Sequence, residues 1–145
     1  MRSGSEHKLK RPDDVETIPG TVEEVADLVQ GMQGCDAIIH LVGIIRAFPS
    51  QDITFERMHT EAAANVVAAA KETKIPRLLH MSALGAKEDG STPYLRTKFA
   101  AEEIVRQSGL NYTIFRPSLI FGRGGEAIKM FGDMVKKYVV PIIGD

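Results

Sequence analysis

The sequence of 145 residues predicts an α/β fold, a three-layer sandwich built around a parallel sheet. Segments with the apolar periodicity of helices alternate along the chain with short segments typical of strands. The strand segments at residues 37–43 (AIIHLVG) and 77–84 (RLLHMSAL) are almost continuous apolar runs, which suit strands buried on both faces of a parallel sheet. Alternation of such strands with helices is the pattern of successive βαβ units.

The N-terminal part of the chain predicts a strand followed by a helix. Residues 15–18 are rich in β-branched side chains and stop at a Pro-Gly turn. Residues 22–32 repeat apolar side chains at helical spacing. Thr21 stands where a helix N-cap is expected, and Glu24 follows three residues later as the partner of a capping box.

The centre of the chain predicts a second strand, a long helix and a third strand. The strand covers residues 37–42, and a helical stretch follows at about residues 55–73. This stretch contains the sequence AAANVVAAAK, whose small side chains permit close packing against a sheet. The next strand covers residues 78–83.

The C-terminal part predicts a helix, a fourth strand and a last helix. Residues 93–109 form the first of these, with Pro93 in its first turn and Gly109 as its stop signal. The strand at residues 112–117 follows, and residues 126–138 (EAIKMFGDMVKKY) form the last helix.

Composition excludes several classes of protein. The net charge of −1 gives no basis for binding nucleic acid. The single cysteine, Cys35, cannot form an internal disulfide and favours a reducing compartment, so we expect a cytoplasmic protein. No apolar run approaches the ~18 residues of a membrane span.

Tyr94 and Lys98 lie four residues apart where a helix begins, and Ser82 ends the strand before it. Ligands bind beyond the carboxyl ends of the strands in open parallel sheets, so these side chains can converge. A tyrosine hydroxyl has a pKa near ~10, and an ammonium one turn away favours the phenolate. Such a pair can move a proton to or from a hydroxyl or carbonyl, while the serine orients the same oxygen. The pair alone is weak evidence, because solvated Tyr and Lys often share a helix surface.

Other polar residues have structural interpretations. His40 and His80 lie inside apolar strands without the spacing of metal ligands, so we expect buried, hydrogen-bonded histidines and no metal. Glu102 and Glu103 are expected on a solvated helix face, paired with Lys98 or Arg106. The glycine-rich stretch at residues 121–127 (FGRGGEA) predicts a plain loop rather than a phosphate cradle.

Four blocks together resemble the extended and atypical short-chain dehydrogenases/reductases. These blocks are GCDAIIHLVGII (34–45), RLLHMSALGA (77–86), PYLRTKFAAEEIV (93–105) and YTIFRPSLIFG (112–122). The nearest branch contains the NADPH-binding accessory subunit of respiratory complex I and bacterial nucleoside-diphosphate-sugar epimerases. The resemblance implies a Rossmann-like fold, an NAD or NADP cofactor and a small-molecule substrate.

The resemblance also assigns roles to individual residues. It implies that Tyr94 is the general acid/base, that Lys98 lowers its pKa and binds the nicotinamide ribose, and that Ser82 orients the substrate oxygen. The implied cofactor-binding residues are Arg2, Leu41, Val42, Gly43, Lys98, Pro117 and Ser118. Arg2 stands where an arginine favours a 2′-phosphate, which tilts the expectation toward NADP.

The sequence departs from the family pattern at three places. The G-x-x-G-x-x-G turn is absent. Thr21 stands where relatives commonly have an aspartate that touches the adenine. His59 stands where many relatives have an asparagine of the proton relay, and its alternative role is that of a helix residue facing a polar loop.

The missing turn predicts that residues 1–145 are a partial NAD(P)-binding Rossmann domain, covering strands three to six of the family without its substrate domain. Such a segment would bind NAD(P) weakly or not at all. Its exposed sheet edge at AIIHLV would pair with another chain, or the family's third strand would move into the vacant place beside it. Two function classes stay open. One is an oxidoreductase or epimerase/dehydratase that acts on a hydroxyl or carbonyl, for example of a nucleotide sugar. The other is a non-catalytic NAD(P)-binding module, such as a redox sensor or an assembly or structural subunit.

Overall fold

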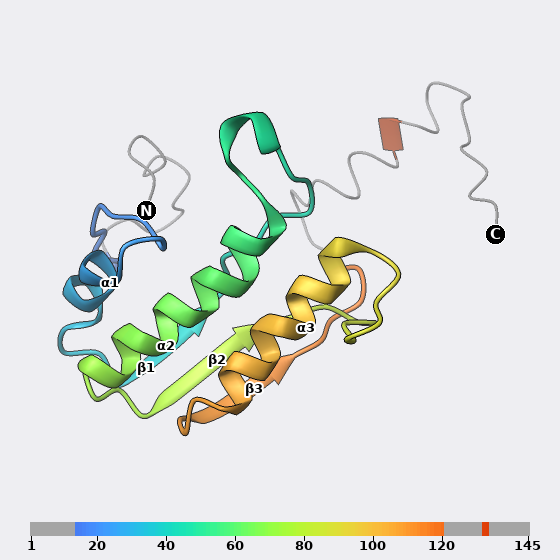
Figure 1. Cartoon of the computed structure of the whole chain (residues 1–145). Helices are drawn as coiled ribbons and strands as arrows, with labels where there is room; N and C mark the ends of the chain where they lie inside the picture. Colours follow the sequence, from blue (N-terminus) through green and yellow to red (C-terminus); the bar gives the residue numbers. More distant parts are fainter. Residues whose placement is uncertain (1–13, 121–131, 134–145) are drawn as a thin grey trace.

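The computed structural model, which describes residues 14–120 and 132–133, contains a parallel sheet of three strands (Figure 1). The strands are β1 (Ala37–His40), β2 (Arg77–Met81) and β3 (Asn111–Phe115), in the order β1-β2-β3. Both pairs of neighbours are parallel, with His40 opposite His80 and His80 opposite Ile114. The predicted α/β fold with a parallel sheet is therefore confirmed.

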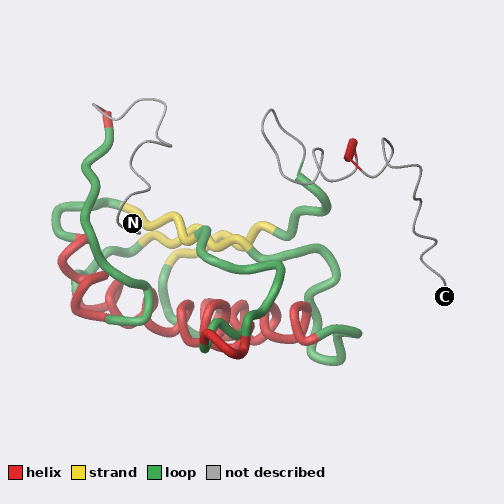
Figure 2. The backbone as a smooth tube through the Cα atoms, turned by 90° about the horizontal axis from the view of Figure 1, so that it is seen from above, coloured by secondary structure: helices red, strands yellow, loops and turns green. Residues whose placement is uncertain are grey.

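Helices cover one face of this sheet (Figure 2). The main helices are α1 (Val25–Met32), α2 (Ala62–Glu72) and α3 (Pro93–Arg106). Two shorter elements precede α2, namely the 3-10 turn η3 (Pro49–Gln51) and the π-helical η4 (Glu56–Glu61). Within the described ranges no helix covers the opposite face, so the second helical layer of the predicted sandwich is not seen in this part of the chain.

The core lies between the sheet and helices α2 and α3. Leu78 of β2 is fully buried and belongs to one apolar cluster with Val67 of α2 and Val105 of α3. Ala69 and Ala70 are also fully buried, and their small side chains let α2 lie close against its neighbours. The stretch of small residues in the sequence is thus the packing face of a helix, as predicted.

Helix α3 has the predicted start and stop signals. Thr92 is its N-cap, and the Thr92 hydroxyl accepts a hydrogen bond of 3.3 Å from the Leu95 N–H. Pro93 occupies the first helical position, where its missing N–H costs no hydrogen bond. After the helix, Gly109 adopts a φ of 78°, a left-handed conformation that glycine adopts without strain.

The N-terminal predictions are wrong in two respects. Residues 15–20 form no strand: they are mostly exposed, and β-branched side chains do not form a strand without packing. Helix α1 begins at Val25 rather than at residue 22, so Thr21 does not cap it. Instead, the Thr21 hydroxyl accepts from the Glu23 N–H at 3.2 Å, and the Thr21 N–H donates to the Asp27 carboxylate at 2.8 Å.

The described residues test three further predictions only in part or not at all. Of the predicted helix at residues 126–138, only residues 132–133 are described, and these are helical. Among the helices that the structure describes, none is both long and apolar enough to cross a bilayer. Self-association through the edge at β1 stays a prediction.

His40 and His80 are buried, as predicted. The prediction that their rings are hydrogen-bonded is wrong. Their rings stack with centroids 5.2 Å apart on the helix-covered side of β1 and β2. His40 Nε2 and both ring nitrogens of His80 have no hydrogen-bond partner among the described residues. Burial, reinforced by neighbouring charged groups that include Lys98, lowers the pKa of His40 to about 3 and that of His80 to about 4. Both imidazoles are therefore neutral near pH 7.

This pair predicts acid sensitivity at mild pH. The unfolded chain binds protons at histidine near pH ~6.5, whereas the folded chain does not, so stability falls as pH drops below that value. For each buried imidazole, we expect the free energy of unfolding to fall by about 1.4 kcal/mol when the pH is lowered from 7.5 to 5.5. Urea denaturation at both values measures the loss, and His80→Leu should make it smaller. Equal stability at the two values would contradict the prediction.

Candidate functional site

A pocket of about 510 Å³ lies at the carboxyl ends of the three strands, where ligands bind in open parallel sheets. Its walls come from the loops after β1, β2 and β3 and from the first two turns of α3. The residues that line it are Leu41, Gly43, Ile44, Ile45, Met81, Ser82, Ala83, Leu84, Tyr94, Lys98, Pro117, Ser118, Leu119 and Ile120.

The pocket brings together most of the residues that the sequence singled out. Ser82, Tyr94 and Lys98 line it, as do the predicted cofactor-binding residues Leu41, Gly43, Pro117 and Ser118. Val42 lies outside it and lines two neighbouring pockets near the Gly20 turn. Arg2 lies outside the described residues, so the structure gives no position for the expected contact with a 2′-phosphate.

Lys98 fixes the floor of the pocket. Its side chain is buried, and its Nζ donates a hydrogen bond of 3.1 Å to the Met81 carbonyl at the end of β2. A Cβ atom placed on Gly43 would lie 2.9 Å from this Nζ and 3.4 Å from the His59 ring. Gly43 therefore leaves room for the ammonium group beside the backbone of the loop after β1.

Tyr94 lies one helical turn before Lys98 and is surrounded by aromatic rings. The ring of His59 meets it edge-on at 5.3 Å, and the ring of Phe55 meets it edge-on at 5.9 Å. Burial disfavours the charged form of both side chains, so it raises the pKa of Tyr94 and lowers the pKa of Lys98. The expectation that Lys98 lowers the tyrosine pKa is therefore not met in this structure, where loss of solvation outweighs the ammonium charge.

His59 holds the loop after β1 to helix α3. The Thr97 hydroxyl is 2.9 Å from the Pro93 carbonyl and donates within its own helix, so it accepts from His59 Nδ1–H, also at 2.9 Å. The other nitrogen, Nε2, then has a free lone pair and accepts from the Ile44 N–H at 3.1 Å. Burial lowers the pKa of His59 to about 4, in agreement with this neutral ring.

This geometry decides between the two roles considered for His59. Both ring nitrogens are occupied by hydrogen bonds within the protein. His59 is therefore a helix residue that faces and fixes a polar loop, and it does not carry a free nitrogen toward a substrate. It lies in the π-helical turn η4, and such turns recur near functional sites.

Ser82 lines the pocket, but its side chain is turned toward the helices. It follows the alternation of β2, in which Leu78 and His80 also face the core, and it is 3% exposed. The hydroxyl lies beside the Glu102 carboxylate and favours its charged form, although no hydrogen bond of normal geometry joins them. To reach a substrate oxygen the Ser82 side chain has to change rotamer.

Glu102 is the important residue that sequence reasoning missed. It was expected on a solvated face, yet it is fully buried one turn after Lys98 on α3. Arg116 Nε donates to one carboxylate oxygen at 2.7 Å, and Arg116 also binds the second oxygen. Arg106 binds that second oxygen at 2.7 Å as well.

The charges in this cluster compensate one another. Burial alone would raise the pKa of Glu102, but the hydrogen bonds from Arg116 and Arg106, together with the nearby Ser82 hydroxyl, outweigh it and hold the pKa below its ordinary value. Arg116 immediately precedes Pro117 and Ser118 in the chain. Glu102 therefore anchors the pocket wall that follows β3 to helix α3, and the spacing Tyr94, Lys98, Glu102 could have indicated that this residue shares their face.

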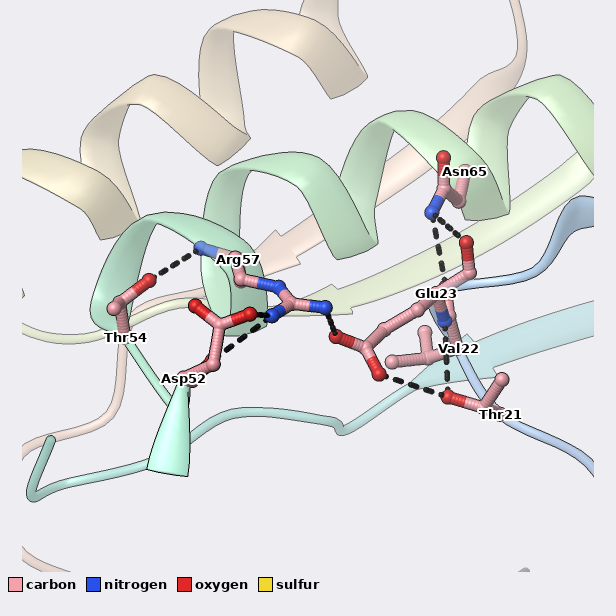
Figure 3. A network of polar contacts seen from close by, with 7 residues as sticks. All are labelled: Thr21, Val22, Glu23, Asp52, Thr54, Arg57 and Asn65. Atoms are coloured by element: carbon pink, nitrogen blue, oxygen red, sulfur yellow. Dashed lines mark hydrogen bonds and ion pairs between the residues drawn. The ribbon is translucent and has the colours of Figure 1, made fainter. Parts of the chain in front are cut away.

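A second polar network supports the other end of the site (Figure 3). At its centre the Arg57 guanidinium binds the Glu23 carboxylate at 2.5 Å and the side chain and backbone of Asp52. The Asn65 amide donates to the carbonyls of Val22 and Glu23 at 3.1 and 3.0 Å. These contacts hold residues 20–23 beside a second cavity of about 620 Å³, which Val42 and Gly43 also line.

The fold and this site define a class of protein, the Rossmann-type dinucleotide-binding domains. A family model described as NAD(P)H-binding matches residues 2–133, so the chain belongs to this NAD(P)H-binding family. The curated relatives and the solved structure that follow fit the resemblance to the extended short-chain dehydrogenases/reductases.

Three curated relatives illustrate the family. A ketoreductase of Stigmatella aurantiaca, named for 4-hydroxy-2-methyl-3-oxo-4-farnesyl-3,4-dihydroquinoline-1-oxide, is 32% identical over 72% of the chain and 37% of its own length. The ceramide reductase of Caulobacter vibrioides is 27% identical over 99% and 44%, respectively. The mouse NADH dehydrogenase 1 alpha subcomplex subunit 9 is 29% identical over 79% and 30%.

A solved structure agrees with the fold. The Bordetella bronchiseptica enzyme WbmH, in complex with NAD⁺, superposes with a TM-score of 0.68 at 18% identity, covering 88% of this chain and 51% of that one. The chain spans less than half the length of the three curated relatives.

The buried carboxylate predicts a matched pair of variants. Glu102→Gln leaves Arg116 without a counter-charge and Arg106 with Glu103 alone, and we expect it to lower the free energy of unfolding by about 2–3 kcal/mol. Glu103→Gln is the control, because Glu103 is partly exposed and pairs with Arg106 alone; it should cost less than about 1 kcal/mol. Chemical denaturation of both variants at pH 7.5 measures the difference. Equal losses would show that the buried cluster is not an anchor.

Proposed function

We propose that this chain is the cofactor-binding and catalytic part of an NAD(P)-dependent short-chain oxidoreductase that acts on a hydroxyl or carbonyl group. The observation that carries the proposal is the convergence of Tyr94 and Lys98 with the ends of all three strands in one pocket. The motif by itself would not distinguish catalysis from a solvated helix surface, but here Lys98 is buried, Tyr94 is half-buried and both line a cavity.

The residues of the site fit a dinucleotide cofactor. Gly43, whose missing side chain leaves room for the Lys98 ammonium, lines the pocket together with Pro117 and Ser118. In this proposal Leu41, Val42 and Gly43 contact the adenine-ribose and pyrophosphate part, and Pro117 and Ser118 the nicotinamide end. Lys98, already beside the Met81 carbonyl, binds the ribose, and Arg2 favours NADP. The bound cofactor supplies the hydride.

The protein's own part of the chemistry is proton transfer. The Tyr94 hydroxyl donates a proton to the carbonyl oxygen in reduction and accepts it from the alcohol in oxidation. Burial raises the pKa of Tyr94, so the hydroxyl carries its proton near pH 7 and the proton is available for the carbonyl oxygen. Ser82 orients the substrate oxygen once its side chain turns into the pocket.

Relatives named for reactions support this proposal. One is named as a ketoreductase and another as a ceramide reductase. Epimerase or dehydratase chemistry on a nucleotide sugar is the variant favoured by the solved structure of a dTDP-glucose 4,6-dehydratase, which shares the fold.

A non-catalytic role is the second candidate. Relatives from mouse and Arabidopsis thaliana are named as subunits of NADH dehydrogenase. In that case the same pocket would bind NAD(P) as part of an assembly, and the tyrosine hydroxyl would be dispensable. The variants below distinguish the two candidates.

Removal of one oxygen atom tests catalysis. In the full-length protein, Tyr94→Phe should lower kcat by at least about 100-fold and leave cofactor affinity nearly unchanged. Lys98→Ala should damage both, because in this proposal Lys98 binds the ribose, and its hydrogen bond to the Met81 carbonyl holds the helix that carries Tyr94. Tyr112→Phe is the control. Tyr112 lies in β3 and does not line the pocket, so removal of its hydroxyl should leave kcat and cofactor affinity unchanged. If Tyr94→Phe turns over at the wild-type rate, the catalytic proposal is wrong and the non-catalytic role is favoured.

Addition of a methyl group at Gly43 tests the proposed cofactor site. Gly43→Ala should weaken NADPH binding to the full-length protein by about tenfold, equivalent to ~1.4 kcal/mol, because the new Cβ displaces the Lys98 ammonium. Gly31→Ala is the control, since its Cβ in α1 meets nothing within 4 Å. It should leave affinity unchanged and raise the unfolding free energy by about 0.5–1 kcal/mol. Calorimetric titration measures the affinities, and unchanged binding in Gly43→Ala would place the cofactor elsewhere.

A further inference from the structure

The rim of the pocket is unusually apolar for a solvent-facing surface. Five large apolar side chains that line it are between 47% and 85% exposed: Leu41, Ile45, Leu84, Leu119 and Ile120. They come from the loops that follow all three strands, so the apolar character surrounds the site. Apolar side chains gathered around a pocket mark a surface that covers an apolar ligand or partner.

The polar groups of the pocket are few and concentrated at its floor. In the described lining, polar side chains come from Ser82, Tyr94, Lys98 and Ser118 alone. Lys98 is the only cation among them, and its Nζ is bound to the Met81 carbonyl. A nucleotide sugar carries a diphosphate, which proteins bind with arginine, lysine or convergent N–H donors. The cofactor's own diphosphate needs groups of this kind, and the described lining offers no arginine and no lysine besides Lys98 for a second diphosphate.

We propose that the substrate is a ketone or secondary alcohol that carries a long hydrocarbon chain. This inference rests on the proposed function. The polar end of the substrate meets Tyr94 at the floor, and the chain leaves the pocket along the rim, across Ile45 and Leu84. In the proposed function Pro117 and Ser118 contact the nicotinamide. The Leu84 N–H donates to the Pro117 carbonyl at 2.8 Å, so a chain that passes Ile45 and Leu84 leaves the pocket beside the nicotinamide end.

The reaction balances without another reactant. A hydride from NADPH adds to the carbonyl carbon, and the Tyr94 hydroxyl gives its proton to the carbonyl oxygen, which forms the alcohol. NADPH becomes NADP⁺, and a proton from solvent restores the tyrosine. The chain takes no part in the chemistry, and its contribution is binding energy from the apolar rim.

A homologous series of substrates tests the inference. We expect kcat/KM of the full-length protein with NADPH to rise about two- to fourfold for each added methylene from 2-butanone to 2-undecanone. The variants Ile45→Ser and Leu84→Ser should flatten this dependence. Val15→Ser is the control: Val15 is also exposed, but it does not line the pocket, so the dependence should keep its slope.

Two results would overturn the inference. One is turnover of the ketones without dependence on chain length. The other is inhibition by UDP-glucose at lower concentration than by 2-undecanol. If no ketone is reduced, equilibrium binding of 2-undecanone and 2-butanone to the protein loaded with NADPH decides. Tighter binding of the longer ketone would support the apolar ligand and refute the catalytic proposal, and equal binding would refute the apolar ligand as well.

Discussion

The hydrogen bond from Lys98 Nζ to the Met81 carbonyl sets the position of helix α3 over the end of β2. Met81 is the last residue of its strand, so the bond joins the helix to the sheet where the sheet opens into the pocket. Tyr94 lies one turn earlier on the same face and is thereby held at the pocket. The loop after β1 must also pass the buried ammonium, and Gly43 stands where a side chain would collide with it. Helix, strand and loop thus depend on one buried contact.

A second attachment, one turn further along α3, holds the opposite wall. Glu102 binds Arg116, which connects β3 to the segment carrying Pro117 and Ser118. His59 performs the corresponding task for the loop after β1 by joining Ile44 to Thr97 of α3. All three loops of the pocket are therefore fixed to the same helix, and its rigidity defines the geometry of the site.

The sequence contained enough information for the elements with strong local signals. The apolar runs at β1 and β2 and the Pro93 and Gly109 signals of α3 are determined by neighbouring residues, and these elements formed as predicted. Residues 15–18 have the composition of a strand, but a strand also needs packing and pairing, which composition does not provide. The shift to π-helical hydrogen bonds at residues 56–61 likewise depends on contacts that the local pattern does not contain.

Some residues of the candidate site could likewise be predicted from local sequence, and others could not. Tyr94 and Lys98 share a motif, so their proximity follows from helix geometry. Glu102 looks like any surface glutamate, because the partner that makes its burial tolerable, Arg116, lies 14 residues away and reaches it only through packing of β3 beneath α3. The open nitrogens of His40 and His80 were also unpredictable, since hydrogen bonding of a buried ring depends on side chains contributed by other elements.

The strand order β1-β2-β3 also has a consequence for how this unit is built. Each strand pairs with the next strand in the chain, and α2 and α3 span the two crossovers. Every new strand is therefore added at the edge of the growing sheet, and none has to be inserted between strands that are already paired. The described part of the chain can therefore assemble in the order in which the ribosome releases it, one βα unit after another.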